Sequence, residues 1–133
     1  MKKYYYIDDS VLLEKNFYLK IEELLQTEKD LCFLLDVSVN ARIADYRTLG
    51  READALALEN MVNLFAALGN TLQVDTNDGF DPSSLEPMAT KDMLTVLTQQ
   101  QKVKDVFSLL GKKVQILTLH EGELVPFVHD TGA

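Results

Sequence analysis

The polar residues best suited to chemistry in this sequence gather between residues 75 and 86. Residues 75–81 read Asp-Thr-Asn-Asp-Gly-Phe-Asp, which resembles a calcium-binding loop because calcium takes several oxygen ligands from a sharply turning backbone. The spacing departs from such a loop, since counting from Asp75 puts Phe80 at the obligatory glycine position. Counting so that Gly79 is correct puts Val74 and Leu85, which cannot chelate, at the two ends. We therefore expect a polar turn here and no metal site.

The histidines and the cysteine also favour structural roles. His120 and His129 fall in a predicted C-terminal hairpin, on one face but about six residues apart at ~3.3 Å each, so they could not share a metal ion. A histidine needs a positioned partner before it acts as a base or a ligand. Cys32 lies between Leu31 and Phe33, a setting typical of a buried structural thiol, because reactive thiols occupy electropositive and partly exposed places.

Two pairs of adjacent carboxylates could serve acid–base chemistry. Neighbouring residues of a helix point apart, so Glu22-Glu23 is not a natural dyad. Asp8-Asp9 is interpreted as a helix-entry feature, which the dipole of a following helix would favour. The serines lie in no nucleophile elbow, and the sequence contains no glycine-rich phosphate loop. We therefore expect no catalytic, cofactor-binding or metal-binding residues, and this absence argues against an enzyme.

Acidic side chains outnumber basic ones, and the excess is concentrated in one segment. The chain carries 21 Asp and Glu against 13 Lys and Arg, a net charge of −8, of which residues 51–90 supply −6. Nucleic acids and anionic membranes repel such a surface, so we expect neither as a direct partner. A protein with a basic surface would fit. The predicted partner-binding residues are the acids of this segment: Glu52, Asp54, Glu59, Asp75, Asp78, Asp81 and Glu86. The alternative is that these acids only keep a small protein soluble.

Length and composition predict that residues 1–133 form a single compact domain. The size is typical of one domain, and 47% hydrophobic residues argue against disorder. A lone cysteine cannot form an internal disulfide, which favours a reducing compartment, the cytoplasm. No stretch of the sequence approaches the roughly 20 apolar residues that a membrane span requires.

Short β-rich segments predict several strands. The aromatic run at 4–7 favours a strand, and 114–119 with 124–128 favour a hairpin turning at Glu121-Gly122. Pro126 cannot donate to a ladder, so its strand is expected at the sheet edge. Residues 31–39 alternate like a strand but also fit helical spacing, and we favour the strand.

Apolar residues at helical spacing predict helices from about residue 11 to 25, over 51–68, and from about 89 to 110. The helix at 51–68 has so narrow a polar stripe that we expect it at the centre of the core or packed against another subunit. Its predicted buried residues are Leu56, Met61, Leu64, Phe65 and Leu68. The predicted fold is α+β, with three to four helices packed on a small, mainly antiparallel sheet that includes the C-terminal hairpin. A mostly helical bundle plus the hairpin is the alternative.

The sequence contains more apolar residues than a single core would bury, and this excess predicts self-association. The helix at 51–68 is apolar almost all round, and both faces of the C-terminal hairpin are apolar. A homodimer would cover these surfaces. A three-layer fold that buries them within one chain is the alternative.

Three functions compete on this sequence. The acidic segment and the lack of a catalytic constellation favour a non-enzymatic protein-binding module, such as an inhibitor, an adaptor or an assembly chaperone. A small enzyme or ligand-binding protein with a site of dispersed residues is the alternative. An acidic mimic of nucleic acid is the second alternative, which the 13 basic residues disfavour. A polar pocket holding a titratable group of shifted pKa would favour the enzyme, whereas an exposed apolar patch rimmed by acids would favour the binding module.

Overall fold

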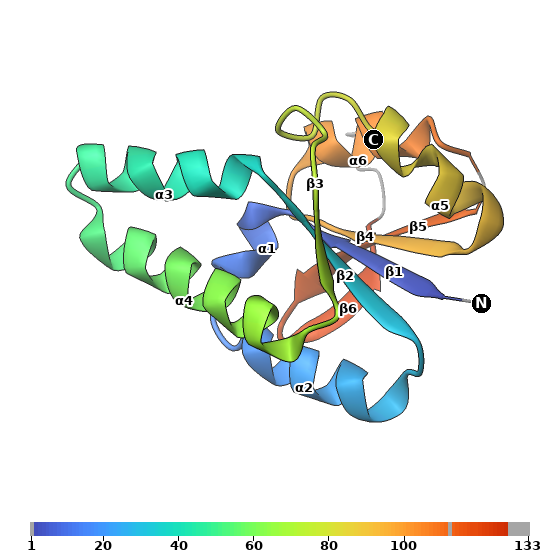
Figure 1. The fold of residues 1–133 in the computed structure, drawn as a ribbon, viewed down its shortest axis with the longest axis horizontal. Coiled ribbons are helices and arrows are strands. Elements are labelled where there is room, and N and C mark those ends of the chain that lie inside the picture. The colour runs from blue at the N-terminus through green and yellow to red at the C-terminus, as the bar shows by residue number, and fades with distance from the viewer. Residues whose placement is uncertain (1, 112, 128–133) are drawn as a thin grey trace.

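The computed structural model describes residues 2–111 and 113–127, whose strands form one sheet in the order β3-β2-β1-β4-β5-β6 (Figure 1). The strands are β1 (Lys3–Ile7), β2 (Leu31–Asp36), β3 (Thr71–Val74), β4 (Met93–Leu97), β5 (Val114–His120) and β6 (Glu123–Pro126). The α-helices are α1 (Asp9–Leu12), α2 (Phe17–Thr27), α3 (Ser38–Thr48), α4 (Glu52–Leu68), α5 (Glu86–Lys91) and α6 (Gln101–Ser108). A short 3₁₀ helix, η1 (Ser83–Leu85), precedes α5.

The sheet is mostly parallel. The pairs β1–β2, β1–β4, β2–β3 and β4–β5 are parallel, and β5–β6 is antiparallel. The predicted mixture of helices and strands is confirmed, but the mainly antiparallel sheet is wrong, and so is the helical bundle. The predicted helix at 89–110 is in fact α5, β4 and α6. Because helices precede and follow β4, the chain makes the crossover connections that parallel neighbours require.

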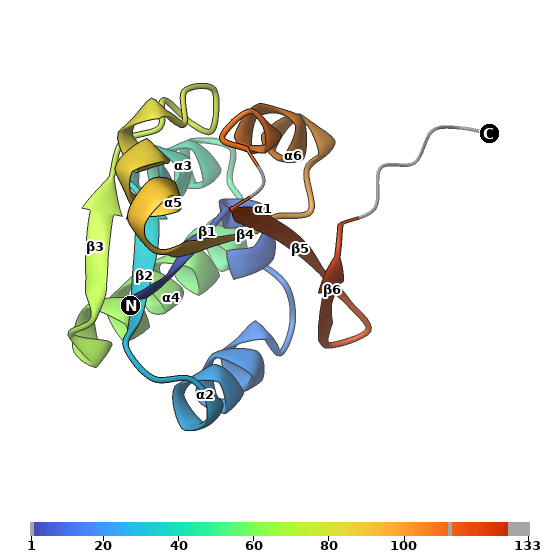
Figure 2. The same cartoon turned by 90° about the vertical axis from the view of Figure 1, so that its right-hand side faces the viewer.

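Helices cover both faces of the sheet. On β1, Tyr5 and Ile7 pack into a core with α1, α2, α3 and α4, while Tyr6 packs into a second core with α5 and α6. Figure 2 shows the two layers, with α5 and α6 above β4 and α2 below it. Every residue of β2 is buried, as expected for a parallel strand covered on both sides. The fold is therefore three-layered.

The C-terminal hairpin forms in the predicted register. His120 pairs with Glu123, and Leu119 pairs with Leu124. Glu121 and Gly122 have φ of 51° and 81°, the left-handed conformation that a tight turn of this kind needs at both positions. The strand with Pro126 lies at the sheet edge, as predicted. Residues 128 and 129 of the predicted hairpin lie outside the described residues.

The helix predictions need two corrections. The helix expected over 11–25 is divided into α1 and α2 by Asn16, whose φ of 68° is left-handed. Helix α4 matches its predicted range and ends at Gly69 with φ of 76°, but its buried stripe is Ala55, Leu58 and Phe65. Of the predicted core residues, Phe65 is buried and Met61, Leu64 and Leu68 are partly buried. Leu56 is wrong, because this side chain lies off the stripe and is 49% exposed.

Burial on both faces of the sheet accounts for much of the apolar excess within one chain. The homodimer stays a prediction. Among the described residues, no helix combines the length and the apolar character needed to cross a membrane.

Two leucines of α4 test the assignment of its buried stripe. Leu58→Ala should lower the free energy of unfolding by about 2–5 kcal/mol, because it removes fully buried methyl groups and leaves a cavity. Leu56→Ala is the matched control and should cost about 0.5 kcal/mol or less, the range of surface substitutions. Urea unfolding of both variants measures the two losses. Equal losses would show that the stripe is assigned wrongly.

Candidate functional site

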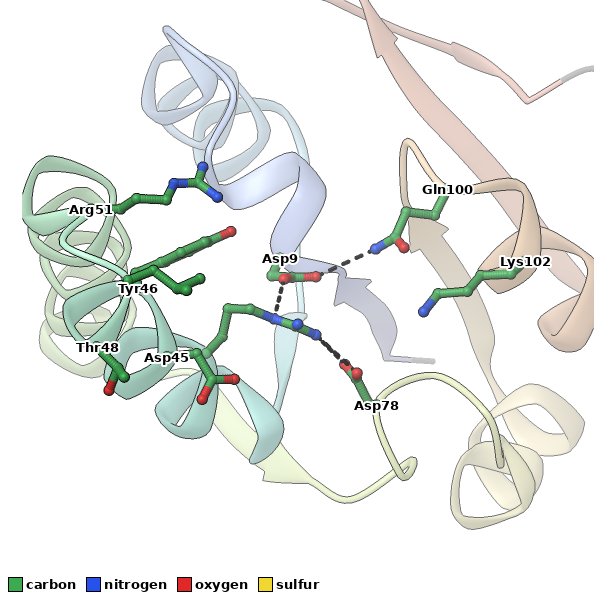
Figure 3. A pocket seen from close by; sticks show the side chains of 10 residues that line it. Asp9, Asp45, Tyr46, Thr48, Arg51, Asp78, Gln100 and Lys102 are labelled. Carbon is green, nitrogen blue, oxygen red and sulfur yellow. Dashed lines mark hydrogen bonds and ion pairs between the residues drawn. The ribbon is translucent and has the colours of Figure 1, made fainter.

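The strand order reverses between β1 and β4. The chain leaves β1 toward β2 and β3, then returns to β4 on the other side of β1. In open parallel sheets, ligands bind beyond the carboxyl ends of the strands at such a reversal. A pocket of about 530 Å³ lies there (Figure 3). Its lining residues are Asp9, Arg42, Asp45, Tyr46, Thr48, Leu49, Arg51, Asp78, Gln100 and Lys102.

Asp36, the last residue of β2, fixes the edge beneath one side of the pocket. Its Oδ1 accepts the Ser38 amide at 3.0 Å, and its Oδ2 accepts the Thr76 amide at 3.0 Å and the Tyr6 hydroxyl at 3.2 Å. The Thr76 hydroxyl also donates to Oδ2. Burial pushes the pKa of Asp36 upward, but the hydrogen bonds from Thr76 and Ser38 outweigh it and hold the pKa below its usual value. Asp36 therefore ties β1, β2 and the end of β3 together as an anion.

Asp8, the residue after β1, likewise accepts several hydrogen bonds, here on the side of β4. Its Oδ2 accepts the Thr98 hydroxyl at 2.9 Å, the Gln100 side-chain amide at 2.8 Å and the Ser10 hydroxyl. Its own backbone amide donates to the carbonyl of Leu97 at 2.9 Å. These contacts join the ends of β1 and β4, the two strands between which the order reverses.

Asp9 differs from both because its carboxylate lies in the pocket wall. The carboxylate is 13% exposed, and Arg42 Nε lies 3.0 Å from its Oδ2, an ion pair without the geometry of a hydrogen bond. Arg42 Nη2 also donates to both oxygens of Asp78 at 2.9 Å. Arg42 therefore contacts both carboxylates. Helix α3 thereby holds the loop after β3 against the end of β1.

Burial and the neighbouring Asp8 carboxylate raise the pKa of Asp9 to about 6. The Arg42 charge opposes this shift, while the Asp78 charge adds to it. A carboxyl group that titrates near pH 6 can give or take a proton close to neutral pH. Asp9 is therefore the lining residue best suited to proton transfer.

The predicted partner-binding acids on α4 do not form a free acidic surface. Glu52 and Glu59 converge on Arg47, at 3.2 Å and 3.3 Å. Asp54 pairs with Arg51 at 2.8 Å. Arginines of α3 and of the α3–α4 connection thus neutralise much of this charge locally.

The other predicted acids lie in the loop after β3 and in α5. Asp75 and Asp81 accept backbone amides within their own loop, those of Asn77 at 3.0 Å and Ser83 at 3.1 Å. Asp78 lines the pocket, and Glu86 begins α5. The structure therefore brings Asp78 to the candidate site and leaves the other predicted acids outside its lining.

The remaining candidate residues have structural surroundings. Cys32 is buried, and burial raises the pKa of its thiol. His120 is exposed in the hairpin, 3.9 Å from Glu121, and His129 lies outside the described residues. Within residues 2–111 and 113–127, no three His, Cys, Asp or Glu side chains are grouped closely enough to hold a metal ion.

The sequence reading missed Arg42, Tyr46, Gln100 and Lys102, and it interpreted Asp9 only as a helix-entry residue. That interpretation is partly right, because Asp9 is the first residue of α1. The available signal was the short run Met93–Leu97, which is followed at once by polar residues 98–100. Polar residues after a buried parallel strand mark the ligand-binding edge.

Compared with protein-family models, curated proteins and solved structures, the chain matches none of them. The function must therefore be inferred from the geometry of this pocket.

The ion pair with Arg42 gives a direct test of the pKa of Asp9. Carboxyl-carbon NMR should place the midpoint for Asp9 near pH 6, and Arg42→Gln should raise it because the opposing positive charge is lost. Arg47→Gln is the control and should leave the midpoint unchanged, because Arg47 pairs with Glu52 and Glu59 instead. A midpoint near pH 4 in the wild type would contradict the assignment.

The same shift predicts how stability depends on pH. The folded-state pKa of Asp9 lies above its ordinary value of 3.8, so the protonated form stabilises the fold. That contribution should be present below about pH 3.8 and be lost as the pH rises through about 6.

Proposed function

We propose that this chain is a small enzyme that binds a polar small molecule in the pocket at the carboxyl edge of the sheet, where Asp9 transfers a proton. One observation carries the proposal: a carboxyl group with a pKa of about 6 lines a polar pocket of about 530 Å³. Pockets of this size are typical of small-molecule sites. Titratable groups with perturbed pKa values concentrate in such sites.

The geometry supports a division of roles in the pocket. At pH 7 the ionised form of Asp9 prevails, so this residue acts as a general base toward substrate, and below about pH 6 as a general acid. Arg42 is a positioning residue, because its contacts with Asp9 and Asp78 fix the carboxylate and moderate its pKa. A cytoplasmic location is part of the proposal, supported by the single, buried Cys32.

A protein-binding module that uses acids of residues 51–90 is the second candidate, and one observation favours it. Glu52, Leu56 and Glu59 recur at i, i+4 and i+7 and share a face of α4, and Leu56 is 49% exposed between the two acids. An exposed apolar residue between carboxylates suits a partner with a basic surface. A homodimer belongs to the same class of proposal. The pairing of both acids with Arg47 reduces the charge that such a partner would meet.

Turnover of metabolites by the Asp9→Asn variant tests the enzyme proposal. Incubated with a small-molecule cell extract, the wild type should consume at least one metabolite, followed by mass spectrometry, at a rate that rises with pH through about 6. Asp9→Asn should slow this consumption by about 10²–10⁴-fold, the usual contribution of a general acid or base. Asp30→Asn, at an exposed acid that precedes β2 at the opposite edge of the sheet, should retain it.

Equal turnover by the wild type and Asp9→Asn would contradict the role of Asp9. No turnover by the wild type, together with salt-sensitive capture of a basic protein that Glu59→Lys abolishes, would favour the binding module instead.

A further inference from the structure

Lys102 stands apart from the other cations that line the pocket. Arg42 is paired with Asp9 and Asp78, and Arg51 is paired with Asp54. Within the described residues, no carboxylate lies at ion-pair distance from Lys102. Its ammonium lies 4.7 Å from the centre of the Phe80 ring, a cation–π contact that orients a charge without neutralising it. Although acids outnumber bases 21 to 13 in the chain, Lys102 therefore presents a positive charge, unpaired among the described residues, in the pocket wall.

Arg51 offers further donors on the opposite side. Its Nε is engaged by Asp54, and its guanidinium lies over the Tyr46 ring at 4.5 Å, which fixes the plane of the group. A guanidinium has five N–H donors, so one contact to Asp54 leaves most of them for another acceptor. Figure 3 shows Arg51 and Lys102 on opposite sides of the pocket, each with its charged end directed inward.

We propose that the ligand of this pocket carries an anionic group, a phosphate or a carboxylate, that is bound by Lys102, while Arg51 on the opposite side donates to another acceptor of the same ligand. The inference rests on the enzyme proposed above and names its substrate class. The lining residues include three carboxylates, Asp9, Asp45 and Asp78, and three cations, Arg42, Arg51 and Lys102, so the charges of the pocket wall balance. Arg42 engages two of these carboxylates, which leaves Lys102 as the local positive charge that a ligand can meet. Asp45, Arg51 and Lys102 are all exposed, so solvent and salt screen their charges alike until a ligand covers them.

Binding of such an anion is linked to the protonation of Asp9. The charged groups around that carboxyl are Asp8, the residue before it, Arg42 on α3 and Asp78 on the loop after β3, with Lys102 of α6 across the pocket. A bound anion adds negative charge near Asp9 and favours its protonated form. The affinity for an anion of fixed charge should therefore rise as the pH falls through about 6.

Amide NMR on the 15.0 kDa chain tests this with simple probes. Inorganic phosphate and, in a parallel arm, acetate are titrated at constant ionic strength. At least one anion should give saturable shifts at the amides of residues 78 and 100–102, and the comparison shows which chemistry the pocket prefers. Lys102→Gln should weaken binding about tenfold, the effect of losing one charge-assisted hydrogen bond.

Lys104→Gln is the matched control, because this lysine lies on the same helix with its ammonium 5.9 Å from the Phe127 ring and does not line the pocket. It should bind the anion as the wild type does. Asp9→Asn should fold, and between pH 5 and 7 its affinity should change only with the protonation of the probe anion itself.

Failure to saturate with either anion, or equal weakening in the two lysine variants, would overturn the inference. If either result is found together with turnover that depends on Asp9, the enzyme proposal holds and its ligand belongs to another chemical class. Anion binding that depends on Lys102, without any turnover, would keep the inference and overturn the enzyme.

Discussion

A buried carboxylate that accepts several hydrogen bonds cannot be removed without leaving its donors unsatisfied, and this fold places such a carboxylate on either side of β1. Asp36 holds the ends of β2 and β3 together with Tyr6, and Asp8 joins the ends of β1 and β4. Parallel strands lack hairpin turns that would fix their relative positions, so these side chains set the geometry of the carboxyl edge. The pocket depends on that geometry, since its walls come from the segments that follow all four of these strands.

The surroundings of Asp9, by contrast, disfavour its ionised form and so lower the stability of the fold at neutral pH. Burial and the Asp8 charge raise its pKa, and Arg42 only partly compensates. Stable folds tolerate such local conflicts chiefly where function requires them. The contrast among neighbouring carboxyls therefore supports a functional role for Asp9 and structural roles for Asp8 and Asp36. Arg42 contacts the carboxylates of both Asp9 and Asp78. Its single charge therefore holds Asp9 in place but only partly offsets the raised pKa of Asp9.

The elements predicted from the sequence are those specified by local signals. The alternation of 31–36, the turn residues Glu121-Gly122 and the apolar spacing of 52–68 are sufficient for β2, the hairpin and α4. Local signals do not determine the sheet order. The run Met93–Leu97 also fits the spacing of a buried helix face, and parallel strands are not joined by a hairpin turn whose residues could be recognised. A helix over 89–110 leaves no strand β4, and without β4 the sheet has no reversal of strand order that would indicate the candidate site. Arg42 could not be found locally at all, since only the fold brings it to Asp9 and Asp78.

The free energies of unfolding of Asp9→Asn and Asp36→Asn at pH 7 test this division of roles most directly. Asp36→Asn should lose at least about 1–3 kcal/mol, because the amide cannot satisfy the donors from Ser38 and Thr76. Asp9→Asn should lose nothing, or gain on the order of 1–3 kcal/mol, because it removes a charge that the folded state disfavours. A loss for Asp9→Asn as large as that for Asp36→Asn would make Asp9 one more structural carboxylate and contradict its proposed role.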